Sequence, residues 1–429
     1  MRRTAFISIV PVSLALLACA AARPRYGGTL RVETRAQIRD LDPAISPDDS
    51  LDRAAKSNLL SQVFETLVRL DEKGRPQPLL ADSWSHDEAQ RRWVFRVRPR
   101  VVFHDGAPWA PPNGVVTVSD DRPIEQILRD LSLLKNAVVL RAVDGSILGT
   151  GPFKVERFEP GKMLLLAAHE QHWAGRPFLD AVEVRMGRNF HDQAQDAQTG
   201  QEDVTELPVT EVRRARQRGD VVALSAPLET LVLRWNGARP PSPTLPEALS
   251  LAVDRASIQS VLLQKMGEVS AALLPQWLSG HAIAFPVDRD PARARQLASA
   301  PVTLGLDYDR QDAILRAVAE RIALNAAECD ITLQIGPLPG VRLAWLRVIS
   351  PDPDLALDEI GATPATGPDH KADPFERESA LLSSAFVASL AQVPVAHALS
   401  PRVQGWLGAR WVATDRWDLA GLWLGDVAQ

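Results

Sequence analysis

Hydrophobic and polar positions alternate in two neighbouring stretches near residue 100. In Arg92–Arg98, the side chains of Trp93, Phe95 and Val97 fall on one face and arginines fall on the other. An alternation with period two is typical of a half-buried strand. The stretch 101–106 follows directly and can pair back on the first. The pattern therefore predicts an antiparallel β region whose outer face is polar.

A helical spacing occurs just before this region. Leu59, Leu60, Val63, Phe64 and Leu67 recur at intervals of one, three and four residues, which places them on one face of a helix. A second helix is predicted after Thr244–Glu247, because this stretch has the form of a Ser/Thr-x-x-Glu capping box with a proline inside the first turn.

Gly149–Val155 separates the β region from the strands that follow. Two glycines and a proline predict a tight turn that leads into an extended segment. Pro160-Gly161 then predicts a hairpin between this segment and the apolar strand 162–168.

The second half of the chain predicts a parallel sheet. The stretch 228–235 has the composition of a buried strand. Farther on, strand 302–308, a helix with apolar positions from Ile314 to Ile322 and strand 331–335 form a β-α-β unit, and either Asp309 or Asp312 can cap its helix. Such a crossover is almost always right-handed and joins parallel strands. The predicted fold class is therefore α/β.

Composition sets limits on the whole molecule. The chain has 429 residues, of which 45% are hydrophobic and 24% are charged, and this length suggests two or three domains. The formal net charge is −5 and no long basic tract is present, which argues against binding to nucleic acid.

The N-terminus has the form of a secretory signal. Arg2 and Arg3 precede an apolar run over residues 5–17, which is short for a membrane span. Leu16–Cys19 has the form of a bacterial lipobox, which implies cleavage before Cys19 and attachment of lipid to its sulfur. We expect a signal peptide over 1–18 and a lipidated linker over 19–26. The alternative is a signal peptide that is cut elsewhere.

Only two cysteines are present. If Cys19 carries lipid, Cys329 has no partner for an intramolecular disulfide. Cys329 lies in an apolar helical pattern, and we expect it to pack in the core rather than to react. A metal site built on cysteine is excluded, and the eight histidines show no spacing typical of metal ligands.

Several stretches in a fixed order resemble one family. The chain is similar to the family 5 extracellular solute-binding proteins, the peptide-, nickel- and oligosaccharide-binding subunits of ABC importers. The similar stretches are Gly27–Val32, Gln62–Asp71, Pro78–Trp84, Val102–Gly106, Gly149–Val155, Trp173–Asp180 and Ala248–Arg255.

The resemblance implies a type 2 periplasmic-binding-protein clamp, in which two α/β lobes are joined by a hinge and carry a peripheral domain. The ligand of such a clamp lies in the cleft between the lobes. On this basis we expect a first lobe over 27–48, 146–236 and 384–429, a peripheral domain over 49–145 and a second lobe over 237–383.

The chain also departs from the family. Only about forty residues separate Gly106 from Gly149, where the family carries a longer segment, so we expect a trimmed peripheral domain. Peptide binders of the family hold the ligand's α-amino group with an aspartate a few residues before an Asp-Pro pair. The local match, Val348–Pro353, has no acid at that spacing. Neither peptide nor nickel specificity is supported by these residues.

Aromatic residues and one arginine are the candidates for ligand contacts. The chain has eleven tryptophans and only two tyrosines, and tryptophan side chains often line binding clefts. The guanidinium of Arg234, at the presumed hinge, could pair with a carboxylate ligand, or it could simply be a surface arginine. For each tryptophan the alternative is packing in the core. The candidate ligand contacts are Trp109, Phe153, Arg234, Trp235, Asn236 and Trp406, with Trp84, Trp411 and Trp417 as further aromatic candidates.

No catalytic motif is found in the sequence. It has no Gly-x-Ser-x-Gly elbow, no His-Glu-x-x-His and no phosphate-binding loop. We therefore expect a protein that is not an enzyme, with a secreted hydrolase as the remote alternative.

The predicted function is that of a monomeric, lipid-anchored binding protein in the periplasm or at the cell surface. It would capture a peptide-like or other small organic solute without a cofactor or metal and deliver it to the membrane subunits of an ABC importer. The alternative is a divergent member that no longer serves transport and acts as a receptor, a sensor or a chaperone-like binder.

Overall fold

The computed structural model describes residues 23–87, 91–236, 240–360, 373–384, 387–406 and 417–425. The predicted signal peptide, Cys19 and Trp411 lie outside these residues. In the described part of the chain, no helix is both long enough and apolar enough to cross a membrane.

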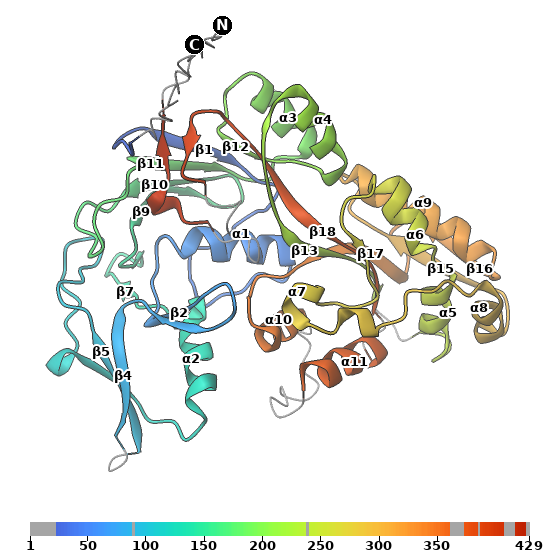
Figure 1. The fold of residues 1–429 in the computed structure, drawn as a ribbon, viewed down its shortest axis with the longest axis horizontal. Coiled ribbons are helices and arrows are strands. Elements are labelled where there is room, and N and C mark those ends of the chain that lie inside the picture. Colours follow the sequence, from blue (N-terminus) through green and yellow to red (C-terminus); the bar gives the residue numbers. More distant parts are fainter. Residues whose placement is uncertain are drawn as a thin grey trace, which may run out of the picture.

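One large mixed sheet runs through the molecule (Figure 1). Its strand order is β16-β15-β17-β13-β18-β12-β1-β11-β10-β9, and β14 pairs with β18. These strands are β1 (Thr29–Glu33), β9 (Phe153–Glu159), β10 (Met163–Ala168), β11 (Ala181–Arg185), β12 (Val204–Glu206), β13 (Val221–Asn236), β14 (Glu268–Val269), β15 (Val302–Asp307), β16 (Ile331–Ile335), β17 (Gly340–Arg347) and β18 (Val387–Leu399).

Helices flank this sheet, and α5, α8 and α9 lie at its β15–β16 end (Figure 1). Several of the helices begin at an aspartate or asparagine that caps the first turn with its side chain, among them Asp49, Asn189, Asp254, Asp290 and Asp312. The helices are α1 (Ser50–Leu60), α2 (Ile124–Ser132), α3 (Phe190–Gln198), α4 (Val212–Arg218), α5 (Leu245–Ala252), α6 (Arg255–Ser257), α7 (Gln276–Ser279), α8 (Pro291–Ala298), α9 (Ala313–Ala327), α10 (Pro353–Ile360) and α11 (Pro374–Ser384).

The strands on one side of the sheet enclose the first core. Strand β1 pairs in parallel with β11, and β9 and β10 continue the sheet as the predicted hairpin. Their inward side chains, including Leu30, Phe153 and Leu164, pack with Leu59 of α1 and Phe64 of the segment after it. The helix predicted through Leu67 therefore ends earlier, at Leu60, and the later apolar residues pack from a turn and a coil. We call this part the first lobe.

A second core lies at the other end of the sheet. The predicted β-α-β unit is confirmed: β15 and β16 are parallel, with Val302 opposite Ile331, and α9 connects them. Residues of α5, α8 and α9 pack on these strands, and Cys329 is fully buried among them, as expected. We call this part the second lobe.

Two long strands join the lobes. Strands β13 and β18 pair antiparallel along most of their lengths, and the register shifts on both sides of Pro227, which lies opposite Pro394. Proline has no N–H to donate, so the ladder between the strands is interrupted there. This point is a natural place for the lobes to bend relative to one another.

A smaller core lies beside the first lobe. The predicted antiparallel β region is present as the sheet β4-β5-β6, and α2 packs nearby. The expected pairing of 101–106 with 92–98 is wrong, because β5 pairs with β4 and β6, whereas Val102 forms a bridge with Pro108 in a local turn. Phe95 and Val97 are buried, and the intervening Arg96 is exposed. The strands around this core and near it are β2 (Val68–Leu70), β3 (Pro76–Pro78), β4 (Ala81–Asp87), β5 (Arg92–Val97), β6 (Val115–Val118), β7 (Leu140–Arg141) and β8 (Ile147–Leu148). The short strands β19 (Val403–Gln404) and β20 (Trp423–Leu424) pair separately near the C-terminus.

The turn before β9 is held by close backbone contact. A Cβ atom on Gly149 would lie 2.0 Å from the carbonyl oxygen of Val63, and one on Gly151 would lie 2.4 Å from that of Gln62. Neither glycine has a positive φ. Glycine is required here for the close approach of two segments rather than for an unusual backbone angle.

One predicted cap is wrong. Helix α5 begins after Thr244 as expected, but the Thr244 hydroxyl donates to the carbonyl oxygen of Leu297 instead of capping its own helix. The capping box is absent because this threonine ties the start of α5 to the end of α8.

Candidate functional site

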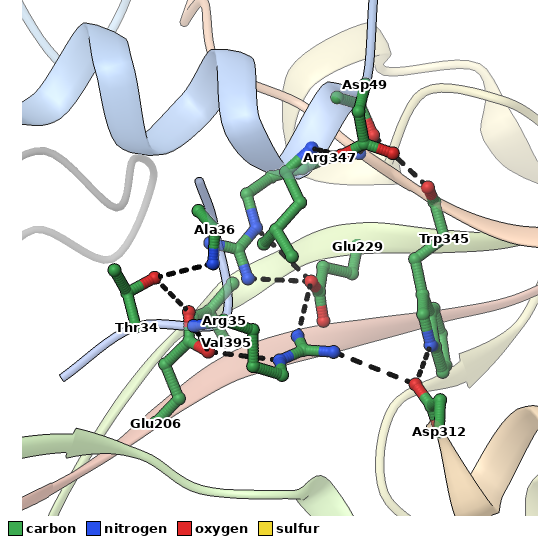
Figure 2. A network of polar contacts seen from close by, with 12 residues as sticks. Thr34, Arg35, Ala36, Asp49, Glu206, Glu229, Asp312, Trp345, Arg347 and Val395 are labelled. Carbon is green, nitrogen blue, oxygen red and sulfur yellow. Dashed lines mark hydrogen bonds and ion pairs between the residues drawn. The ribbon is translucent and has the colours of Figure 1, made fainter. Parts of the chain in front are cut away.

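Charged side chains from both lobes meet at the junction of the lobes (Figure 2). Arg35 and Glu206 come from the ends of β1 and β12 in the first lobe, and Asp312 precedes α9 in the second lobe. Glu229 and Arg347 lie opposite each other on β13 and β17. The four residues other than Arg35 are all at most 8% exposed.

Arg35 lies at the centre of this group. Its Nε donates to Glu206 Oε2 at 3.0 Å, and its two terminal nitrogens lie 3.8 Å from Glu229 and 3.7 Å from Asp312. Its guanidinium also lies 4.1 Å from the centre of the Phe190 ring. One arginine therefore links carboxylates of the two lobes, with an aromatic ring against its face.

Glu206 is held ionised by its neighbours. It accepts hydrogen bonds from the Thr34 hydroxyl at 3.1 Å and from the Arg35 backbone N–H at 3.0 Å. Burial by itself would raise the pKa of Glu206, but the charges of Arg35 and Arg347 outweigh it and lower the pKa to about 2. The buried carboxylate is therefore charged at neutral pH.

The second lobe supplies its own ion pair and a capped helix. Arg347 donates to Glu229 Oε1 through Nη2 at 2.6 Å and through Nε at 3.2 Å. Asp312 caps α9 with Oδ1, as the sequence suggested, and its Oδ2 accepts from the Trp345 indole N–H at 3.0 Å. Each carboxylate at the junction thus has a donor.

Little space remains inside the network. The pocket between Arg35, Glu229, Asp312 and Trp345 has a volume of about 20 Å³, which is room for about one water molecule. With Arg35 in contact with carboxylates of both lobes, the clamp is in a closed arrangement.

A larger cavity lies next to the network and shares Arg347 with it. Its volume is about 130 Å³, similar to a cavity that accepts a molecule the size of benzene. The second lobe contributes residues 347–351, Leu355 and Glu359 to its wall, and the other wall comes from α1 and from residues 61–79 and 132–134. Pockets of about 970 and 620 Å³ also occur, but the second lobe lines neither of them.

The polar walls suit a small polar ligand. Serines and an asparagine of α1 and the turn after it face Ser350 and Glu359 across the cavity. Among the described residues, no group of three or more histidine, cysteine, aspartate or glutamate side chains is placed to hold a metal ion.

Two of the candidate contacts lie in cores. Trp109 packs against the smaller core of β4–β6, and its backbone N–H donates to the carbonyl oxygen of Val101. Phe153 is fully buried in the core of the first lobe. Trp84 packs against the smaller core as well.

Three of the candidates lie together at the end of β13. Arg234 is exposed and lies opposite Arg342, while Asn236 is exposed opposite Gly340. Trp235 is half-buried against the core of the second lobe.

The remaining candidate, Trp406, packs against the core of the first lobe, and its ring lies 5.8 Å from those of Trp417 and His397 in tilted contacts. None of the six candidates lines either interlobe pocket in the described part of the chain. Their role in binding stays a prediction.

The residues that meet at the junction were not candidates in the sequence. Arg35 and Glu206 are 171 positions apart, and no local pattern relates them. One signal was present: Glu229 interrupts an apolar run, Leu228–Leu233, in a strand predicted to be buried. A buried charge of this kind requires a partner.

Solved structures with the same fold are periplasmic binding proteins. The ABC transporter-associated periplasmic binding protein DppA of Helicobacter pylori, solved with the peptide STSA, superposes with a TM-score of 0.77 at 17% identity, covering 94% of this chain and 99% of that one. The oligopeptide-binding protein AppA of Bacillus subtilis, solved with a nonapeptide, gives a TM-score of 0.75 at 15% identity, covering 94% and 100%. The predicted fold, a type 2 periplasmic-binding-protein clamp, is confirmed.

The chain belongs to the bacterial extracellular solute-binding proteins, family 5, whose model matches residues 135–375. This confirms the family suggested by the sequence motifs. Among curated relatives, AppA of Bacillus subtilis is 21% identical over 299 residues, covering 58% of this chain and 54% of that protein. The nickel-binding periplasmic protein of Escherichia coli is 24% identical over 344 residues, covering 64% and 66%.

A third relative is the probable ABC transporter periplasmic-binding protein SapA of Escherichia coli, which is 26% identical over 275 residues and covers 61% of this chain and 48% of that protein. The chain thus spans about half to two thirds of the length of these relatives. Membership in a family of solute-binding proteins agrees with the prediction that the chain is not an enzyme.

Proposed function

We propose that the protein captures a small organic solute between its lobes and delivers it to the membrane subunits of an ABC importer. The observation that carries this proposal is the interlobe site, where Arg35 links carboxylates of the two lobes beside a cavity of about 130 Å³. A ligand that contacts both walls favours the closed state and shifts the population toward it. The importer is inferred from the relatives, one of which is an ABC transporter binding protein.

The size of the cavity bears on the ligand. The AppA structure was solved with a nonapeptide. A cavity of about 130 Å³ accommodates about six non-hydrogen atoms, far fewer than such a peptide contains. We infer that this protein takes a smaller solute.

The experiment that tests capture is mass spectrometry of the purified protein. Molecules released on denaturation would be identified and then added back in a thermal-shift assay. We expect one small solute that raises the melting temperature in a concentration-dependent way. If nothing is released and no solute in a broad panel stabilises the protein, the solute-capture function is wrong. A bound solute without uptake by cells that carry the importer genes would favour the receptor or sensor alternative.

We also propose that Cys19 carries the lipid that anchors the protein in the periplasm or at the cell surface as a monomer. The chain offers a matched control, because Cys329 is its other cysteine. Cys19→Ser should release the protein from the membrane fraction, and Cys329→Ser should leave it there. If neither substitution releases the protein from the membrane fraction, or if both do, lipidation at Cys19 is contradicted.

A further inference from the structure

Helix α4 carries the densest group of basic residues in the chain. Arginines occupy four of the six positions from 213 to 218, and no other window of six residues contains as many basic side chains. Val212 and Ala215 are buried and hold the helix against β13, and all four arginines are exposed. Because the formal net charge of the whole chain is −5, this helix is a local exception to an acidic molecule.

Two of these arginines have no partner among the described residues. Arg214 and Arg218 each pair with an acid next to the helix, at 3.2 and 2.8 Å. The side chains of Arg213 and Arg216 form no ion pair or hydrogen bond with any described residue. Arg216 lies in the last turn, where a cation suits the helix dipole, but Arg213 lies in the first turn, where the dipole opposes it. The fold of the helix therefore does not account for this charge.

The surface of α4 suits an anionic membrane better than a partner protein. Protein interfaces need an apolar core inside a polar rim. From residue 202 to residue 228, Val221 is the only large apolar side chain that is exposed, and the four cavities described above contain no residue of α4. Anionic lipid headgroups require neither feature, because they attract basic side chains by charge alone.

The position of α4 brings it within reach of a membrane that holds the proposed anchor. Strand β1 follows the linker 19–26 and pairs with β12, with Val32 opposite Val204. Helix α4 comes soon after β12 in the chain, and Figure 1 shows β1, β12 and α4 on one side of the molecule, at the top of the view. A chain of about ten residues spans up to about 35 Å when extended, so a lipid at Cys19 would leave the membrane close to this side.

We propose that α4 lies against an anionic lipid surface and that its arginines orient the anchored protein on the membrane. The lipid at Cys19 would retain the protein, and the arginines would decide which of its faces meets the headgroups. Each basic side chain near such a surface strengthens the attraction, and salt screens it. This inference extends the proposed anchoring and is independent of solute capture.

Vesicles test the proposal on a chain that carries no lipid. The chain 20–429 lacks Cys19 and contains every described residue. It would be mixed with vesicles of phosphatidylcholine alone or with about 30% phosphatidylglycerol, and its partitioning would be measured by sedimentation at about 20 mM and about 500 mM salt. We expect the partition coefficient at low salt to be at least about tenfold higher on the anionic vesicles, and this difference should vanish at high salt.

Two double variants with the same change in net charge locate the effect. Arg213→Gln/Arg216→Gln removes the unpaired arginines of α4, and glutamine has a similar helix propensity. Its partition coefficient on anionic vesicles should fall by about tenfold or more. Arg293→Gln/Arg316→Gln removes two exposed arginines from α8 and α9 in the second lobe and should leave the partition coefficient unchanged. Circular dichroism checks that both variants fold.

Three results would overturn the proposal: equal partitioning of the wild-type chain on both kinds of vesicle, full partitioning of the α4 variant, or equal losses in the two double variants. If the α4 variant keeps full partitioning but binds the importer's membrane subunits in detergent more weakly, the partner is an acidic protein surface instead. Because the tested chain has no lipid and no solute is added, none of these results contradicts lipidation at Cys19 or solute capture, which have their own experiments.

Discussion

Glu229 and Arg347 show what a buried charge requires from its neighbours. They face each other across β13 and β17, and only 8% and 6% of their surfaces are exposed. Removal of one partner from such a pair leaves a buried charge without compensation. Replacement of both by apolar side chains removes the cost of desolvation as well.

We therefore expect Arg347→Met to lower the free energy of unfolding by about 3 kcal/mol. The measurement is urea denaturation, read as a shift in midpoint at constant slope. The double variant Glu229→Leu/Arg347→Met should recover most of the loss. The control is Arg316→Met, whose side chain is 70% exposed and which should change stability by less than about 0.5 kcal/mol. If Arg347→Met and Arg316→Met lower the free energy of unfolding equally, burial of the Glu229–Arg347 pair is unimportant for stability.

His104 carries a pH dependence of stability. Burial, and next the charge of His169, lower the pKa of His104 to about 4. The ring is then neutral at pH 7, with Nδ1 accepting from the Gly149 N–H at 3.2 Å and Nε2 near the Gly151 carbonyl oxygen at 3.3 Å.

The sign follows from proton uptake. An unfolded histidine titrates near pH 6.5, so between about pH 6.5 and 4 the unfolded state binds more protons and stability falls as the pH is lowered. The variant His104→Gln cannot take up this proton. We expect the stability difference between wild type and variant to be largest at pH 7 and to shrink toward pH 4.5, as measured by urea denaturation across a pH series. A difference that is constant over this range would contradict the shifted pKa.

At the scale of elements, local patterns predict strands and helices but not their partners. The alternation at Trp93–Val97 and the β-α-β unit around Ile314 could be predicted because each depends on residues close in sequence. Strand β13 is longer than its apolar run, Leu228–Trp235, because the pairing with β18 continues past Pro227 to Val221. The partners of β18 lie far away in the chain, and no local pattern identifies them.

The interlobe site was predictable only in part, for the same reason. Asp312 was expected as a helix cap, and it is one. Its second role, as a partner of Arg35 and Trp345, depends on how the lobes close. The lack of an acid at the family's spacing before Asp352-Pro353 could be noticed in the sequence, whereas the position of Glu359 beside Ile349 and Ser350 depends on the packing of α10.

The contact between the turn at Gly149–Gly151 and the segment after α1 provides a test at this scale. A Cβ atom at Gly151 would lie 2.4 Å from the Gln62 carbonyl oxygen, a backbone atom that cannot move alone. Gly151→Ala should therefore cost about 2 kcal/mol or more in the free energy of unfolding. The matched control is Gly336→Ala, because the nearest atom to its Cβ is a leucine side-chain carbon at 4.0 Å. If the two alanine variants unfold at the same urea concentration, the close approach does not constrain the fold.

For the whole molecule, several polar contacts hold the closed arrangement. Besides Arg35, the hydroxyl of Ser50 at the start of α1 donates to the Trp345 carbonyl oxygen at 3.2 Å. Arg129 of α2 pairs with Asp352 at 2.7 Å and with Asp354 at 2.9 Å. These contacts lie on the cleft side, whereas β13 and β18 join the lobes behind it. If the lobes open about the irregularity at Pro227 and Pro394, the polar contacts of Arg35, Ser50 and Arg129 would break, whereas the pairing of β13 with β18 would remain.

We expect Arg35 to favour the closed form over an open one. Its guanidinium stabilises the closed form through Glu229 and Asp312, and in the open form these carboxylates regain water. Arg35→Met should therefore shift the population toward the open form, and X-ray scattering should show a larger radius of gyration than for wild type. A solute that binds both lobes should reverse the change, with a weaker apparent affinity because the binding-competent form is less populated.

The exposed Arg214 supplies the control for this experiment. Among the described residues, its ion-pair partner is Glu211, three residues earlier, so Arg214→Met removes a charge without touching the junction and should leave the radius of gyration unchanged. Because Glu206 loses its closest cation in Arg35→Met, a general loss of stability is also expected. The double variant Arg35→Met/Glu206→Gln separates the two effects: it should regain stability but remain open, since Glu229 and Asp312 still lack the bridging guanidinium. A double variant that scatters like wild type would show that Arg35 stabilises the first lobe without linking it to the second.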